Sequence, residues 1–312
     1  MLRSIWHLGA LAALLVLTHP ATAVAQPAPT EAAPAPAELT VADVGFAARY
    51  WEPATGPRKA PVLVLPGSNG GYPSARVGRS LAAAGHPVVG LAYFSAAPAI
   101  PGLPTRLREI PLEYVDRAIG WLAAKSGRPV VLMGESRGAE LALLLGSRRP
   151  KLAGVIAFAP TTAVWRAPPA EANEKPAAAW TEKGKGVAWL SDDDAPGLTS
   201  NQRFDRALAR GKGAARIPVE RIKAPLLLIA GGDDRIWSST PAARSIQAKV
   251  PNATVLHYPD AGHLLMGPGA GVSRFEAPGF VVEFGGTDAT NLAAREDAWA
   301  KTLAFLEKVS AR

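Results

Sequence analysis

The chain has 312 residues, of which 48% are hydrophobic and 19% are charged, and its formal net charge is +8. This composition supplies the apolar side chains of a sizeable core and excludes a disordered or fibrous protein. Because the chain has no cysteine, a disulfide scaffold and thiol chemistry are excluded as well. The positive charge suits anionic surfaces, but no zinc spacing, aromatic-basic RNP signature or heptad repeat accompanies it, so we expect no nucleic-acid partner.

The first 25 residues have the pattern of a secretory signal peptide. Arg3 supplies a positive start, residues 8–17 are uniformly small or apolar, and residues 23–25 read Ala-Val-Ala, a suitable cleavage site. A membrane anchor would need about 20 apolar residues, whereas His-Pro at 19–20 interrupts this run. We therefore expect a periplasmic or secreted protein with no stable membrane anchor.

Residues 26–37 are rich in Pro and Ala and predict a flexible linker, which leaves 38–312 as the folded domain. Within it, short apolar runs alternate with longer segments at helical spacing. Four of the short runs are apolar at almost every position, as in strands of a parallel sheet with both faces covered. The predicted strands are 61–65, 87–93, 129–133, 154–158, 226–229 and 253–258.

Helical spacing of apolar residues appears along 112–122 and again along 141–145. Thr240-Pro241 predicts the N-cap and first-turn proline of a third helix, and apolar residues stripe a final helix around 299–306. The alternation of strands and helices predicts the α/β class, with one open, mostly parallel sheet and helices on both faces.

One stretch, residues 161–218, departs from this alternation. It contains five prolines, five glycines and three tryptophans, and it shows no clear strand. It is too long for an ordinary connection, so we interpret it as a cap-like excursion that faces the substrate.

A Gly-x-Ser-x-Gly motif occupies residues 134–138 and centres on Ser136. It lies between the strand ending near Met133 and the helix beginning near Ala139. A sharp strand-to-helix turn of this kind holds a serine hydroxyl clear of the sheet, and its glycines avoid clashes in a strained backbone. Ser136 is therefore the predicted nucleophile.

A serine nucleophile needs a histidine base that is oriented by an acid, and behind such an elbow the chain order is Ser, Asp or Glu, His. Asp234 and His263 follow two predicted strands in that order, at the sheet edge where open α/β sheets assemble their sites. Asp233 is the alternative acid. His257 is the alternative base, but it lies within a predicted strand, so its ring would point along the sheet.

An oxyanion hole needs two backbone N–H groups near the nucleophile. Arg137 supplies the first because it follows Ser136. The glycine-rich loop 66–71 should supply the second, from Ser68 or alternatively from Asn69. No Gly-Lys-Ser/Thr follows this loop and no H-E-x-x-H motif occurs, so we expect neither a phosphate cradle nor a metal or other cofactor.

Five segments form a further pattern: LAYF at 91–94, IPLEY at 110–114, GESRGAEL at 134–141, GGDDRIWS at 231–238, and FGGT at 284–287 leading to Asp297-Ala298-Trp299. In these segments the chain resembles the catalytic domain shared by acyl-CoA thioesterases and the bile acid-CoA:amino acid N-acyltransferase. The resemblance spans about 60–306 and implies an α/β-hydrolase fold. It also implies that the acid is the second of the paired aspartates, Asp234.

Two departures from that family refine the expectation. Two-domain members carry an N-terminal β-sandwich of about 100 residues, and we expect it to be absent because only 38–59 precede the first strand after the linker. The family's acyltransferase has cysteine where this chain has Ser136, as do the related dienelactone hydrolases, so water is the favoured acyl acceptor.

The sequence thus predicts a hydrolase that cleaves a small-molecule ester or thioester through an acyl-enzyme. An acyltransferase acting on an amine or alcohol, and a non-catalytic binding protein on the same scaffold, are the alternatives. Tyr93, Trp165 and Trp237 are candidate pocket walls, although such aromatics are commonly plain core. The sequence carries no signal for an oligomeric state.

Overall fold

The computed structural model describes residues 35–53, 59–171, 174–211, 213–278 and 280–311. The expected signal peptide, 1–25, and most of the expected linker lie outside these residues. The first strand, β1 (Ala37–Leu39), begins at the last residue assigned to the linker.

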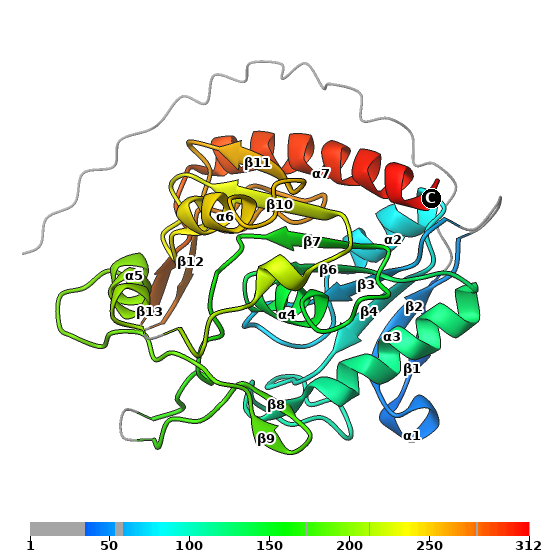
Figure 1. Ribbon diagram of the computed structural model, residues 1–312, viewed down its shortest axis with the longest axis horizontal. Helices are drawn as coiled ribbons and strands as arrows, with labels where there is room; N and C mark the ends of the chain where they lie inside the picture. The colour runs from blue at the N-terminus through cyan, green and yellow to red at the C-terminus, as the bar shows by residue number, and fades with distance from the viewer. Residues whose placement is uncertain (1–34, 54–58, 172–173, 212, 279, 312) are drawn as a thin grey trace, which may run out of the picture. The chain divides into compact units, whose positions relative to one another are not determined.

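An eight-stranded sheet forms the centre of the fold (Figure 1), in the order β1-β2-β4-β3-β6-β7-β10-β11. All six predicted strands are confirmed, and they are parallel neighbours. They are β3 (Val62–Leu65), β4 (Val88–Ala92), β6 (Val131–Glu135), β7 (Gly154–Phe158), β10 (Leu226–Gly231) and β11 (Thr254–Tyr258). Strands β1 and β2 (Ala47–Trp51), which were not predicted from the sequence, extend the sheet in antiparallel fashion at one edge.

Helices cover both faces of the sheet, as predicted. Side chains alternate along each buried strand, so that Leu63 and Leu65 pack into one hydrophobic cluster and Val62 and Val64 into another. The first cluster contains buried residues of α3 (Leu112–Ser126), α4 (Arg137–Gly146) and α6 (Ser239–Gln247). The second contains those of α2 (Ala75–Ala83) and α7 (Asp288–Ser310). The chain therefore has the α/β-hydrolase architecture.

The start of α6 corrects one prediction. Its N-cap is Ser238, and Thr240 lies inside the helix, where its hydroxyl donates to the carbonyl of Gly231 over 2.9 Å. A threonine before a proline is a common N-cap, but here the strand end offers Thr240 an acceptor. Pro241 still lies in the first turn, where a missing N–H costs no helical bond.

The 161–218 excursion holds more regular structure than the sequence showed. Short strands β8 (Trp180–Glu182) and β9 (Lys185–Gly186) join β5 (Ile110–Pro111) in a three-stranded sheet. Helix α5 (Ser200–Arg210) follows, and a 3-10 turn, Val219–Arg221, leads back to β10. Strands of two or three residues are too short to show a period, which explains why they were missed.

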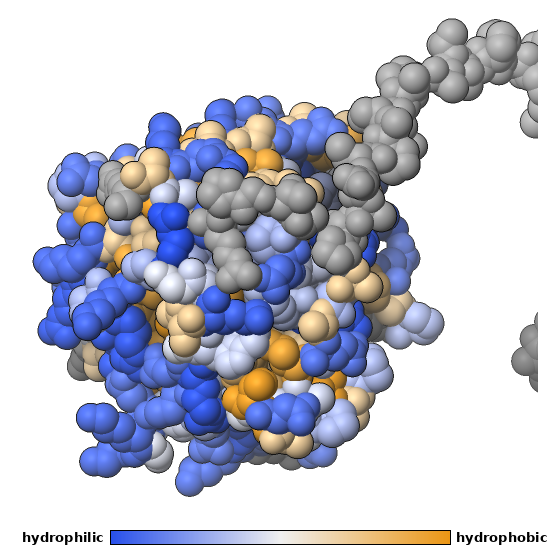
Figure 2. All heavy atoms as spheres, turned by 90° about the vertical axis from the view of Figure 1, so that its right-hand side faces the viewer, coloured by the Kyte–Doolittle hydropathy of each residue, from blue (hydrophilic) through white to orange (hydrophobic). Residues whose placement is uncertain are grey.

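The remaining elements are α1 (Val41–Val44) and a hairpin of β12 (Arg274–Ala277) and β13 (Phe280–Glu283) between β11 and α7. No helix in the described part of the chain is long and apolar enough to span a bilayer. Figure 2 shows one face of the molecule, where hydrophilic residues predominate and hydrophobic ones form small groups.

Candidate active site

Ser136 occupies a strained turn between β6 and α4, as the motif predicted. Its φ of 58° and ψ of −121° are rare for any residue other than glycine. The flanking glycines make the turn possible: a Cβ at Gly134 would lie 2.2 Å from the carbonyl oxygen of Gly138, and one at Gly138 would lie 2.3 Å from that of Leu65. The turn holds Ser136 at the N-terminus of α4, where the residue as a whole is 8% exposed.

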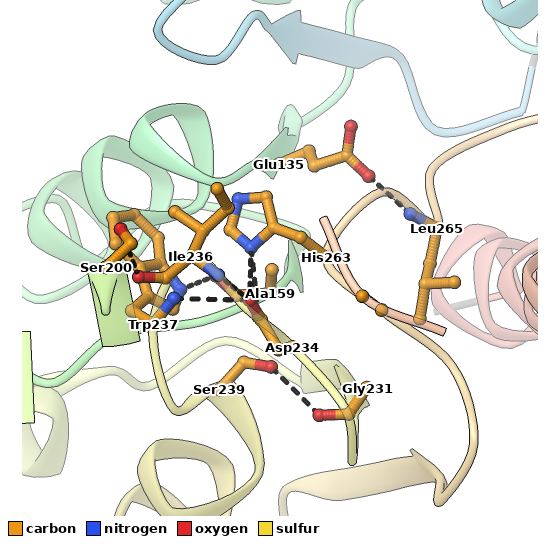
Figure 3. A network of polar contacts seen from close by, with 12 residues as sticks. Glu135, Ala159, Ser200, Gly231, Asp234, Ile236, Trp237, Ser239, His263 and Leu265 are labelled. Carbon is orange, nitrogen blue, oxygen red and sulfur yellow. Dashed lines mark hydrogen bonds and ion pairs between the residues drawn. The ribbon is translucent and has the colours of Figure 1, made fainter. Parts of the chain in front are cut away.

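Asp234 and His263 form a direct pair in the loops that follow β10 and β11 (Figure 3). Nδ1 of His263 lies 2.9 Å from both carboxylate oxygens of Asp234. Asp234 is itself fixed, because its Oδ1 accepts the backbone N–H groups of Ile236 and Trp237 at 3.0 and 3.2 Å. Both members of the pair are buried.

The alternative acid and base lie elsewhere. Asp233 forms an ion pair with Arg235 at 2.5 Å and accepts the backbone N–H of Gly286. His257 is exposed on β11. Of the candidate acids and bases, only Asp234 and His263 contact each other. The structure therefore separates Asp234 from Asp233, and His263 from His257, which the motif and chain order alone could not do.

One ring nitrogen of His263, Nδ1, is hydrogen-bonded to Asp234, whereas the other, Nε2, is not hydrogen-bonded to any described residue. A carboxylate accepts hydrogen bonds, so Nδ1 carries the proton in this pair and Nε2 presents a lone pair. Nε2 is buried and has no hydrogen-bond partner among the described residues. Burial lowers the pKa of His263, but Asp234 and Glu135 together raise it by more, so that the net shift is upward from 6.5.

The serine elbow and the histidine loop lie beside each other. The carboxylate of Glu135, the residue before Ser136, accepts the backbone N–H groups of Leu265 and Met266 at 2.7 Å each. This contact joins the residue preceding Ser136 to the segment that follows His263. Ser136 thus follows β6, and Asp234 and His263 follow β10 and β11, at the carboxyl ends of parallel strands of one sheet. Nε2 of His263 forms no hydrogen bond with the Ser136 hydroxyl in this structure.

The glycine-rich loop that is predicted to contribute to the oxyanion hole lies against the serine elbow. A Cβ at Gly67 would come within 3.5 Å of Cβ of Ser136, which places the glycine-rich loop against the elbow. Ser68 and Asn69 follow in that loop and are exposed. Arg137 is the first residue of α4, so its backbone N–H has no acceptor within the helix.

The side chain of Arg137 makes a buried contact that the sequence analysis missed. It pairs with Glu140 at 3.0 Å and donates to the carbonyl of Trp165 at 2.9 Å. Glu140 in turn accepts from Nε1 of Trp180 at 2.6 Å. Burial raises the pKa of Glu140 to about 7, against a lowering by Arg137. Arg137 and Glu140 of α4 thus bind the 161–218 excursion. In the sequence, only their i, i+3 spacing indicated that the two side chains could pair with each other.

The three candidate wall residues are all buried but differ in their neighbours. Trp237 packs edge-on against His263, with ring centroids 5.3 Å apart. Tyr93 donates its hydroxyl to the carbonyl of Pro66 and so supports the glycine-rich loop. Trp165 packs against Phe204 of α5, which also contacts Trp237. Of the three, Trp237 is the one that reaches the Asp234–His263 pair.

The described residues contain no group of three or more His, Asp or Glu side chains that could hold a metal ion. Three cavities of about 240–320 Å³ in the described part of the chain are lined by other residues, among them Arg148, Lys223 and Lys249, and none includes Ser136, Asp234 or His263.

Comparisons with solved structures support the fold. An esterase of Pyrococcus furiosus matches 88% of this chain and 90% of its own, with a TM-score of 0.54 and 13% identity. A putative dienelactone hydrolase from Klebsiella pneumoniae matches 87% and 98%, with a TM-score of 0.51 and 14% identity. At these identities the likeness concerns the α/β-hydrolase fold alone.

Sequence comparisons identify the family. Human acyl-coenzyme A thioesterase 6 is 25% identical over 280 residues, which cover 84% of this chain and 62% of the relative. Mouse bile acid-CoA:amino acid N-acyltransferase is 24% identical over 281 residues, with the same coverage. The chain thus spans less than two thirds of the length of these relatives. The family model described as "BAAT / Acyl-CoA thioester hydrolase C terminal" matches residues 110–311, and the chain belongs to this family.

Proposed function

We propose that this chain is a serine hydrolase that cleaves a carboxylic ester or thioester through an acyl-enzyme on Ser136. The observation that carries the proposal is the buried Asp234–His263 pair, whose free Nε2 belongs to a loop bonded to the serine elbow. Membership of a family that includes thioester hydrolases, and the esterase-like fold, support the same chemistry.

In the proposed reaction, Nε2 of His263 takes the hydroxyl proton of Ser136 while the oxygen attacks the substrate carbonyl. Asp234 stabilises the imidazolium that forms, without itself taking the proton. The backbone N–H groups of Arg137 and Ser68 stabilise the oxyanion. The imidazolium then protonates the leaving alcohol or thiol, and water, activated by His263, releases the acid and restores the serine.

Graded p-nitrophenyl esters and acyl-CoA thioesters, assayed with the protein and with Ser136→Ala, test this proposal. We expect turnover of at least one series by the wild type and a loss of about 10⁴-fold or more in the variant. Equal turnover by both proteins would refute the mechanism. Activity on esters with none on acyl-CoA would confine the proposal to esterase chemistry.

Acyl transfer is a second candidate because two relatives are named as N-acyltransferases. Their names concern those proteins; for this chain, a competition assay separates transfer from hydrolysis. Added glycine or an alcohol should leave the product distribution of a hydrolase unchanged. Diversion of the acyl group to the added nucleophile would instead favour the transferase.

We also propose that residues 1–25 direct export and that cleavage follows Ala25. The proposal rests on the sequence pattern alone. Expression of the full chain in a Gram-negative host, followed by fractionation and N-terminal sequencing, should give a periplasmic or secreted protein that begins at Gln26. A cytoplasmic protein with an intact N-terminus would overturn it.

A further inference from the structure

Glu135, the residue before the proposed nucleophile, has a side chain that leaves its own strand and reaches the histidine loop. A single oxygen, Oε1, accepts the backbone N–H groups of both Leu265 and Met266 at 2.7 Å. Figure 3 shows the contact with Leu265 beside the Asp234–His263 pair. The Gly-x-Ser-x-Gly motif leaves this position free, so the motif assigns Glu135 no role.

The same loop is held by a second charged side chain. Arg295 of α7 donates from Nη2 to the carbonyl of Met266 at 2.8 Å and from Nη1 to that of Leu264 at 3.3 Å. The backbone N–H of His263 also donates to the carbonyl of Phe284 at 2.9 Å. Side chains from β6 and α7 therefore hold the three residues after His263, while the carbonyl of Phe284 holds the backbone of His263 itself.

Charged side chains near His263 also affect its protonation. The groups that face His263 are Asp234 from the loop after β10 and Glu135 from the end of β6, while Arg295 faces Glu135 from α7. Burial raises the pKa of Glu135 above 4.5, and the opposing effects of His263, Arg295 and the two backbone N–H groups offset only part of that rise. An ionised Glu135 favours the protonated imidazole of His263, which is the form that the proposed proton transfer creates.

We propose that Glu135 is a positioning residue for His263. Its Oε1 fixes the Leu265–Met266 backbone and thereby the ring of His263, and the charge of its ionised form stabilises the imidazolium. The inference rests on the proposed hydrolase function, but its structural part concerns only Glu135 and the histidine loop.

Two substitutions separate the two effects. Glu135→Gln keeps an oxygen that can accept both N–H groups but removes the charge, so it should retain most of kcat. Its acid limb of kcat/KM should move to lower pH because His263 loses an electrostatic partner. Glu135→Ala removes the acceptor too and should lower kcat by about 10–100-fold through misplacement of the base, with a smaller change in KM.

An NMR titration of the histidine ring resonances measures the electrostatic effect of Glu135 on His263 without an activity assay. In protein labelled with ¹³C-histidine, with His263→Asn used to assign the resonance, the titration of His263 should move to lower pH in Glu135→Gln. Glu113→Gln is the matched control, because Glu113 also accepts a backbone N–H, from Lys183 at 2.6 Å, but lies on α3. It should leave the His263 titration unchanged.

An unchanged His263 titration in Glu135→Gln would overturn the inference, even if the alanine variant failed to fold. Wild-type kcat in a folded Glu135→Ala would overturn its positional part. Failure of the proposed function has a different signature, namely full activity in Ser136→Ala, and would leave the NMR result intact.

Discussion

Asp233 and Asp234 are adjacent in sequence, but only Asp234 contacts His263, with both carboxylate oxygens 2.9 Å from Nδ1. The turn after β10 directs one carboxylate inward and leaves the other paired with Arg235 near the surface. This contrast gives two isosteric substitutions at neighbouring positions, one inside the proposed machinery and one outside it.

Asp234→Asn should lower kcat by about 10⁴-fold, because an amide can neither stabilise the imidazolium nor hold the same tautomer of His263. Ester hydrolysis at saturating substrate measures the loss. Far-UV and near-UV circular dichroism should show that the variant retains the native fold.

Asp233→Asn is the control, and its kcat should stay within about twofold of the wild type, since exposed ion pairs contribute little. Similar losses in both variants would mean that the Asp234–His263 contact does not carry the activity.

The activity should fall as the pH is lowered, because a protonated His263 cannot accept the proton of Ser136. Asp234 and Glu135 outweigh burial and raise the pKa of His263 above 6.5 in the folded protein. The midpoint of the acid limb of kcat/KM should therefore lie above that value. A profile that stays flat well below pH 6.5 would contradict the assignment of His263 as the base.

Gly138→Ala should destabilise the fold by about 1–3 kcal/mol, because overpacking forces the backbone to shift. The added Cβ would lie 2.3 Å from the carbonyl oxygen of Leu65 and 2.6 Å from that of Pro66, both backbone atoms that cannot rotate away. Urea unfolding measures the change.

Gly120→Ala provides the comparison, since Gly120 lies in the exposed part of α3 and a Cβ there meets no atom within 4 Å. It should stabilise the helix by about 0.5–1 kcal/mol. Equal effects of the two substitutions would show that the close approach at the elbow does not constrain Gly138.

Glu140 should make the stability depend on pH. Burial raises its pKa from 4.5 to about 7 in the folded chain, so the folded state binds a proton there that the unfolded state releases. Its contribution to the free energy of unfolding is then complete below about 4.5 and is lost as the pH rises through about 7. Glu140→Gln should remove this decline. Parallel stability curves for both proteins between pH 5 and 8 would contradict the account.

The parts of the fold that the sequence predicted are those in which burial imposes a pattern. Four of the six predicted strands read as nearly continuous apolar runs, as expected for strands covered on both faces, and all six predicted strands were found. Strand β2 was missed at the antiparallel end of the sheet, and α5 was missed because only Ala207 of that helix is buried. Thr240 was misplaced by a tertiary contact, its bond to Gly231, which no local signal encodes.

The candidate site shows the same contrast between residues that a sequence pattern specifies and contacts that only the folded chain creates. The strand-to-helix turn at Ser136 and the placement of Asp234 and His263 in the loops after β10 and β11 were predictable because an elbow motif and a chain order specify them. Glu135 and Arg295 were not, because their partners are backbone groups 29 to 131 residues away that only the folded chain brings near. Likewise, the Arg137–Glu140 pair binds the 161–218 excursion through Trp165 and Trp180, whose positions depend on how that stretch folds.

Covalent trapping tests the central proposal most directly. The protein should react with a fluorophosphonate to give a single adduct by intact mass, and peptide mapping should place it on Ser136. Ser136→Ala should remain unlabelled, and His263→Asn should react far more slowly because the base is missing. Equal labelling of Ser136→Ala, or an active wild type that hydrolyses esters without any adduct on Ser136, would contradict the assignment of this serine as the nucleophile.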